Sequence, residues 1–132
     1  MLVGVLRFKL DLDLQRRSAE APVMAYVAGH LAAGQTYLTP VKLQEFRLET
    51  GAPVYVDFKS IPYQDEDVLE WYRREEKARR FYKEGDCTQL QQFAEQEGVQ
   101  RFLLPADHPA RACPGLKTLY ADSSYLLLAF NP

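Results

Sequence analysis

The residue types best suited to bind or transform a small molecule gather at the end of one predicted strand. Residues 54–58 are mainly apolar, and Asp57, Lys59 and Ser60 place a carboxylate, an ammonium group and a hydroxyl at the end of that run. Such a set can bind an anion or the hydroxyl groups of a sugar. Asp57 and Lys59 are two residues apart and share one face of the strand, so an ion pair between them is the simpler interpretation. The sequence leaves both interpretations open.

Further candidate binding residues follow from the expected position of the strands. In an open parallel sheet, ligands bind beyond the carboxyl ends of the strands, where loops and helix N-termini converge. Three loops fall there, over residues 39–40, 57–63 and 105–111. Together with the helices beside them they supply the predicted ligand-binding residues, which are Arg47, Asp57, Lys59, Ser60, Trp71, Arg74 and His108.

Several of these residues also have a structural interpretation. Trp71 follows the apolar spacing of a helix and is typical of a core residue. Arg74 belongs to a group of four arginines on a helix face that is expected to be solvated. His108 has no serine or cysteine beside it in a nucleophile motif and no second histidine at i+4, so we expect a solvent-exposed loop residue. We therefore predict no catalytic residue.

Phosphate-binding, cofactor and metal motifs are absent from the sequence. It contains neither GxGxxG nor GxxxxGK[ST], so no nucleotide or other cofactor is expected. Asp65, Glu66 and Asp67 begin a predicted helix, where acidic residues are favoured anyway, so no metal site is expected. Cys87 and Cys113 lie outside any CxxC pattern. Two thiols are the simpler interpretation, and a disulfide stays open.

The composition limits the size and the partners of the protein. The 132 residues, 47% of them hydrophobic and 12% aromatic, suit one domain with one core. A net charge of -2 gives no general attraction to nucleic acid or to an anionic membrane, so nucleic-acid binding is not expected. The apolar runs are shorter than the roughly 20 residues that cross a bilayer, so we expect no transmembrane segment. The first six residues lack the basic region and cleavage site of a secretory signal.

The predicted elements alternate between helices and strands. An arm, strand or connector over residues 1–17, with period-two alternation in residues 6–14, precedes a single domain over residues 18–132. The order of elements indicates an α/β fold, a three-layer sandwich with a mostly parallel sheet extended by a C-terminal antiparallel hairpin. The strand over residues 54–59 is predicted to be central. The predicted helices cover residues 19–33, 40–50, 68–83 and 87–97, and the predicted strands cover residues 36–39, 54–59, 99–104, 117–120 and 125–130.

Three segments carry a resemblance to a known group of proteins: FRLETG at residues 46–51, VDFKSIP at residues 56–62 and EWYRR at residues 70–74. In this order they resemble the soluble C-terminal region of large, mostly uncharacterised bacterial polytopic membrane proteins. Some of those are similar to the glycosyltransferase and oligosaccharyltransferase type. The resemblance covers residues 21–130, and it implies that residues 2–8 would be the end of a last membrane span or its connector.

Such a parent protein implies a role for the domain. Transfer chemistry in those proteins lies in the membrane part, so the resemblance implies an accessory domain that is not itself an enzyme. The implied partners are the membrane-embedded region of the parent or a partner subunit, with carbohydrate as a further candidate ligand. The implied location is the extracytoplasmic side of a bacterial membrane, where a bond between Cys87 and Cys113 is favoured. Without such a parent, a cytoplasmic location is expected.

Three functional hypotheses follow. The first is a non-catalytic accessory domain that recognises a glycan or a partner subunit, and it predicts a concave polar pocket with an aromatic wall. The alternative is a small stand-alone hydrolase or transferase that uses Asp57 or His108 as a base, and it requires a nucleophile within about 3.2 Å of that base. The third is a purely structural domain that packs on its membrane parent through a large apolar patch.

Overall fold

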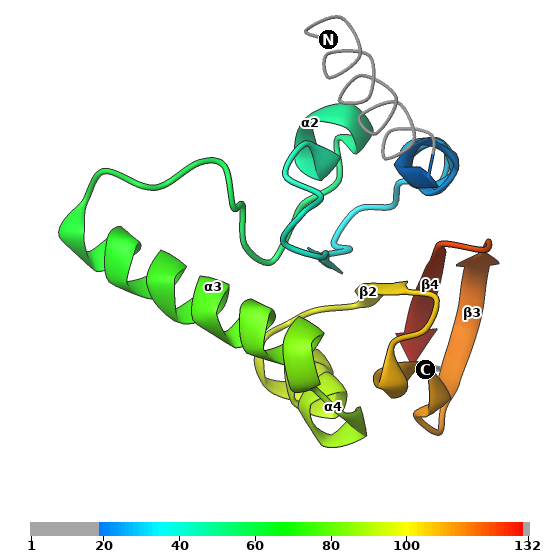
Figure 1. The fold of residues 1–132 in the computed structure, drawn as a ribbon. Helices are drawn as coiled ribbons and strands as arrows, with labels where there is room; N and C mark the ends of the chain where they lie inside the picture. The colour runs from blue at the N-terminus through cyan, green and yellow to red at the C-terminus, as the bar shows by residue number, and fades with distance from the viewer. Residues whose placement is uncertain (1–18, 131–132) are drawn as a thin grey trace, which may run out of the picture.

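The computed structural model describes residues 19–130, and the predicted arm over residues 1–17 lies outside this range (Figure 1). The first element is a helix over residues 19–29, which ends before the predicted boundary at Gly34. The remaining elements are β1 (Tyr37–Leu38), α2 (Phe46–Thr50), α3 (Asp65–Glu84), α4 (Cys87–Gln96), β2 (Arg101–Pro105), the 3-10 helix η1 (Pro109–Ala112), β3 (Leu116–Ala121) and β4 (Tyr125–Phe130).

Within the described residues the strands form one four-stranded mixed sheet in the order β1-β2-β4-β3. β1 and β2 are parallel, whereas β4 is antiparallel to both β2 and β3. The predicted C-terminal hairpin is confirmed, because β3 and β4 pair directly across the short polar turn. The α/β class is also confirmed, but the sheet has one parallel pair instead of three parallel strands.

The prediction of a central strand over residues 54–59 is wrong. Val54 makes a single parallel bridge to Tyr37, so this segment lies beyond β1 at the outer edge of the sheet. Two main-chain carbonyls of the segment bond to side chains of α3 instead of to a further strand. Arg74 donates to the Tyr55 carbonyl at 2.9 Å, and Trp71 donates to the Asp57 carbonyl at 2.7 Å. Tyr55 and Val56 of the segment are buried, and side chains of α3 bond to its outer edge.

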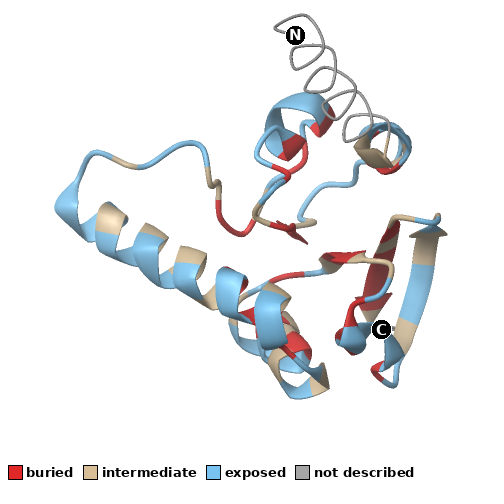
Figure 2. Cartoon of the chain, in the orientation of Figure 1, coloured by how far each residue is buried: buried red, intermediate tan, exposed pale blue. Residues whose placement is uncertain are grey.

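Two clusters of buried side chains lie on the two faces of the sheet. In β2, Phe102 and Leu104 belong to the cluster that contains Phe81 of α3 and Phe93 of α4. The intervening Leu103 belongs to the second cluster, with residues of the helix over 19–29 and of α2. This alternation is the period-two pattern of a strand with helices on both sides. Figure 2 shows the buried positions gathered in β2 and β4.

Helix α3 packs on the core with only part of its length. Ala78 and Phe81, in its second half, are its buried residues, and Trp71 packs partly buried against the core, whereas the N-terminal end of the helix projects from the body (Figures 1 and 2). Ion pairs at i,i+4 spacing form along the helix, Glu75 with Arg79 and Glu76 with Arg80 among them. Exposed pairs of this kind each stabilise a helix by only about 0.3–0.5 kcal/mol.

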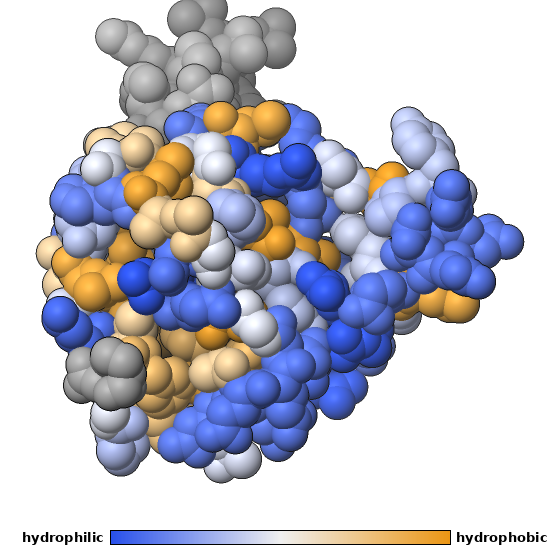
Figure 3. All heavy atoms as spheres, turned by 180° about the vertical axis from the view of Figure 1, so that it is seen from behind, coloured by the Kyte–Doolittle hydropathy of each residue, from blue (hydrophilic) through white to orange (hydrophobic). Residues whose placement is uncertain are grey.

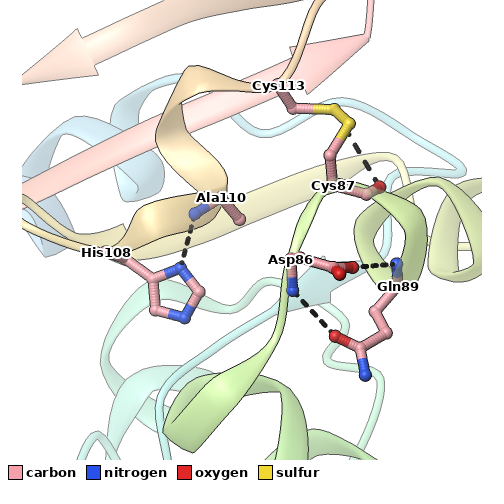
Figure 4. The surroundings of a disulfide bond; sticks show 6 residues. All are labelled: Asp86, Cys87, Gln89, His108, Ala110 and Cys113. Atoms are coloured by element: carbon pink, nitrogen blue, oxygen red, sulfur yellow. Dashed lines mark hydrogen bonds between the residues drawn. A yellow bond between two sulfur atoms is a disulfide. The ribbon is translucent and has the colours of Figure 1, made fainter.

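Local capping fixes the start of α4. The Asp86 carboxylate accepts a hydrogen bond from the Gln89 main-chain N–H, and the Gln89 side chain accepts one from the Asp86 N–H. This reciprocal capping box begins the helix that the sequence predicts over residues 87–97 (Figure 4). The next residue, Cys87, forms a disulfide with Cys113 at the end of η1, with the two Cα atoms 5.1 Å apart. The disulfide thus joins α4 to the loop between β2 and β3.

None of the helices in residues 19–130 combines the length and the hydropathy that a membrane-spanning helix needs.

Candidate functional site

Four of the predicted binding residues lie together in one surface pocket of about 370 Å³. They are Arg47 of α2 and Asp57, Lys59 and Ser60 in the turn after the Val54 bridge. A narrow crevice beside the pocket reaches Thr39, at the carboxyl end of β1. The pocket therefore lies at the carboxyl ends of two parallel segments, as the rule for open sheets predicts. Its lining consists of Gln44, Arg47, Leu48, Asp57, Lys59 and Ser60.

Asp57 is the central residue of the pocket because each of its oxygens accepts a hydrogen bond. One carboxylate oxygen accepts from the Arg47 guanidinium at 3.1 Å, and the other accepts from the Lys59 main-chain N–H at 3.0 Å. The carbonyl oxygen accepts from the Trp71 indole. The bond to the N–H two residues on is an Asx turn, which redirects the chain. Asp57 therefore fixes both the turn and the position of its own carboxylate.

The expected ion pair between Asp57 and Lys59 is not present. Asp57 pairs with Arg47, and the Lys59 ammonium group pairs with Glu45, just before α2. Because the turn begins at Asp57, the two side chains no longer share the face of a strand. Both pairs have at least one partner that is about half exposed, and such pairs contribute at most about 1 kcal/mol each. Neither pair therefore contributes much to the stability of the fold.

Trp71 and Arg74 do not line the pocket. They bind the main chain of the segment that carries Asp57. Both bond to carbonyls of the segment that ends in Asp57, and the Arg74 guanidinium also lies 4.9 Å from the centre of the Tyr55 ring. Their predicted ligand contacts are therefore replaced by a positioning role in this structure. The aromatic wall expected of a glycan pocket is not among the lining residues.

His108 lies elsewhere and is buried, with 5% of its surface exposed. The sequence had indicated an exposed loop residue. Its Nδ1 accepts a hydrogen bond from the Ala110 N–H at 3.1 Å, as Figure 4 shows, so Nε2 carries the proton and donates to the Phe81 carbonyl at 3.2 Å. Pro109 at the first position of η1 allows this capping role. Both ring nitrogens are thus used to join η1 to α3.

The sequence analysis missed three residues at the pocket. Gln44 and Leu48 line it, and Glu45 neutralises Lys59. Gln44, Arg47 and Leu48 have the i, i+3, i+4 spacing of one helix face, and this spacing was the available signal. The sequence did not separate this face from the core, because a leucine at position 48 suits a core position equally well. In the structure the Leu48 side chain is 72% exposed.

The geometry does not assemble a nucleophile and a base. Among residues 19–130, no hydroxyl or thiol group hydrogen-bonds to the Asp57 carboxylate or to the His108 ring. The same residues contain no group of three or more histidine, cysteine or acidic side chains able to hold a metal ion. The polar groups that line the pocket are two cations, one carboxylate, an amide and a hydroxyl, and their chemistry is hydrogen bonding.

Replacement of Trp71 by phenylalanine tests its positioning role. Trp71→Phe keeps an aromatic ring but removes the donor to the Asp57 carbonyl, so we expect the free energy of unfolding to fall by about 1 kcal/mol. We also expect the amide resonances of Asp57 and Lys59 to shift. Urea denaturation and amide NMR spectra provide the measurements. Tyr72→Phe, at an exposed neighbouring position, is the control, and equal effects of the two variants would contradict the role.

A second network of hydrogen bonds and ion pairs holds the same segment through the side chain of Tyr55. The Tyr55 hydroxyl donates to Glu97, which also pairs with Arg73 at 2.9 Å. Burial alone would raise the pKa of Glu97, but the bonds from Tyr55 and Arg73, together with the nearby Lys77, lower it below its usual value. Burial and the bond to Glu97 raise the pKa of Tyr55. The stabilising form of this pair is therefore the neutral phenol with the carboxylate.

This network predicts acid sensitivity. Because the pKa of Glu97 is lower in the folded chain, its stabilising effect is present above the unfolded value, near 4.5, and is lost as pH falls through the lowered folded value. We expect Glu97→Gln to lower the free energy of unfolding by about 1 kcal/mol at neutral pH and to flatten the decline of Tm below pH 4.5. Thermal denaturation between pH 2 and 7 measures this, with exposed Glu95→Gln as the control. A Glu97→Gln slope equal to that of the unsubstituted protein would refute the assignment.

Comparison with known proteins gives one match. No curated protein and no solved structure is similar to the chain. The matched region contains every residue that lines the pocket, together with Trp71 and Arg74, but not His108. It spans residues 18–78, which match the family model of a domain of unknown function, DUF6798.

Proposed function

We propose that this chain is a non-catalytic accessory domain that recognises a glycan through the pocket around Asp57. The observation that carries the proposal is the fixed Asp57 carboxylate beside the guanidinium of Arg47. Gln44 and Ser60, whose side chains hydrogen-bond to no other described residue, face the same cavity. Carboxylates, amides and guanidinium groups in fixed positions suit the paired donor and acceptor sites of sugar hydroxyls.

The disulfide supports a location outside the cytoplasm. Bonds between cysteines persist in oxidising compartments and are rare in the cytosol. We therefore propose that the domain lies on the extracytoplasmic side of a bacterial membrane, as part of a larger membrane protein related to glycosyltransferases. The segments that carry this resemblance include five of the six lining residues, Arg47 and Leu48 in FRLETG and Asp57, Lys59 and Ser60 in VDFKSIP.

Recognition of a partner subunit is the second candidate. Four large apolar side chains lie exposed before α3 and in its first half, namely Ile61, Tyr63, Leu69 and Tyr72. Exposed aromatic side chains of this kind are frequent in protein interfaces. On the face shown in Figure 3, however, the projecting part of the molecule is mainly hydrophilic and its apolar areas are small and separate. This distribution favours the polar pocket as the main site.

A glycan array probed with the full chain, followed by calorimetric titration of each glycan bound, tests the proposal. We expect Arg47→Ala to weaken binding by about tenfold or more, because a hydrogen bond to a charged donor is worth about 1.5–3 kcal/mol. Arg80→Ala is the matched control, since it removes another exposed arginine from an ion pair, that with Glu76. Absence of glycan binding, or equal effects of the two substitutions, would rule out the pocket as a glycan site and leave the partner subunit.

A further inference from the structure

We infer that the glycan recognised by this pocket is uncharged, an inference that rests on the proposed function. The charged groups at the cavity form two ion pairs. Arg47 and Lys59 supply two positive charges, and each is already paired with a carboxylate, Asp57 and Glu45 respectively. The four side chains sum to zero. The pocket is therefore rich in hydrogen-bonding groups without a net charge.

An acidic sugar would have to compete with these internal carboxylates. Asp57 accepts from one nitrogen of the Arg47 guanidinium, so a sugar carboxylate or sulfate could accept from the remaining N–H groups. There it would lie beside the Asp57 carboxylate, whose side chain is only 19% exposed and whose second oxygen is held by the Lys59 main-chain N–H. Two like charges would then share one guanidinium, which raises the free energy of the complex. The pocket therefore disfavours anionic sugars.

A basic sugar is disfavoured for the corresponding reason. An ammonium group that approached Asp57 would lie beside the guanidinium of Arg47, and one that approached Glu45 would lie beside Lys59. A hydroxyl group meets neither difficulty because it both donates and accepts. It can accept from a free N–H of Arg47 while it donates to Ser60 or Gln44, and both ion pairs remain intact.

The exposed side chain of Leu48 completes this chemistry. It lines the pocket with 72% of its surface exposed and follows Arg47 directly in α2. Sugars present C–H groups as well as hydroxyls, and an exposed aliphatic side chain gives those C–H groups an apolar contact. The pocket thus offers a polar wall and an apolar edge, as an uncharged pyranose requires.

The test uses pairs of oligosaccharides that differ only in charge: glucose, galactose and mannose oligomers and the corresponding uronic acid oligomers. Titration calorimetry with the full chain is carried out at 50 and 500 mM NaCl. We expect the neutral member of a pair to bind about tenfold more tightly, with an affinity that changes by less than about twofold with salt, since screening acts only on charged partners.

Glu45→Gln provides the decisive variant because it frees Lys59. It is expected to increase uronate affinity several-fold, in a salt-dependent manner, whereas Glu95→Gln, the same change on α4, leaves all affinities unchanged. Tighter binding of uronates by the unsubstituted chain, or no gain in Glu45→Gln, would overturn the inference while the glycan function stands. Failure of both members of every pair to bind would overturn the proposed function itself.

Discussion

Loss of the Cys87–Cys113 disulfide is expected to lower the free energy of unfolding by about 3 kcal/mol, one of the two largest effects we anticipate. The two cysteines are 26 residues apart, and the bond between them restricts the unfolded chain over the whole intervening segment. That segment contains most of α4 and all of β2 and η1, so the disulfide restricts the unfolded chain around three elements of the fold. For a domain of this size the loss corresponds to a decrease in Tm of about 10 °C.

Thermal denaturation with and without a reductant measures this effect, together with the double variant Cys87→Ala/Cys113→Ala. The double variant serves as the control for the reductant, since it should melt at the same temperature in both conditions. A reductant-induced change in Tm of less than about 2 °C in the unsubstituted chain would contradict the prediction. It would also remove the support that the disulfide gives to an extracytoplasmic location.

The elements predicted correctly are those with signals inside the element itself. The hairpin of β3 and β4 is encoded by apolar runs on either side of a polar turn. The start of α4 is encoded by the spacing of Asp86 and Gln89, which form the capping box. In both cases the residues that decide the structure are a few positions apart, so the sequence pattern contains them.

The prediction of a strand over residues 54–59 failed because its partners are distant in the sequence. Tyr55 and Val56 are buried, as an apolar run indicates. Pairing, however, depends on what satisfies the main-chain carbonyls, and here Trp71 and Arg74 of α3 do so. No pattern within the segment reveals that a helix replaces the neighbouring strand.

The same distinction holds for the candidate site. The position of the pocket followed from the rule that parallel segments end at a common edge, and Asp57 is one of its lining residues. The ion-pair partner of Asp57 could not be predicted from the spacing. The Asx turn at Asp57 directs its carboxylate away from the Lys59 side chain, and Arg47 of α2 pairs with it instead. The burial of His108 likewise depends on Phe81, which is 27 residues away.

Gly85→Ala is expected to lower the free energy of unfolding by about 3 kcal/mol. Gly85 follows α3 and is buried, and its backbone runs against the last turn of that helix. A Cβ atom there would lie 2.5 Å from the Phe81 carbonyl oxygen and 2.8 Å from the Phe81 Cα. Both are backbone atoms, so no side-chain rotation relieves the overlap. The end of α3 or the start of α4 would have to move.

Gly29→Ala is the matched control, because a Cβ at Gly29 meets no atom within 4 Å. At that helical position alanine is expected to be neutral or to stabilise the chain by up to about 1 kcal/mol. Urea denaturation of the two variants measures the difference, and equal stability would show that the approach of Gly85 to Phe81 is not required. The Phe81 carbonyl also accepts the Nε2 proton of His108. A change in the His108 ring resonances in Gly85→Ala, but not in Gly29→Ala, would therefore locate the disturbance at the junction that joins α3 to η1.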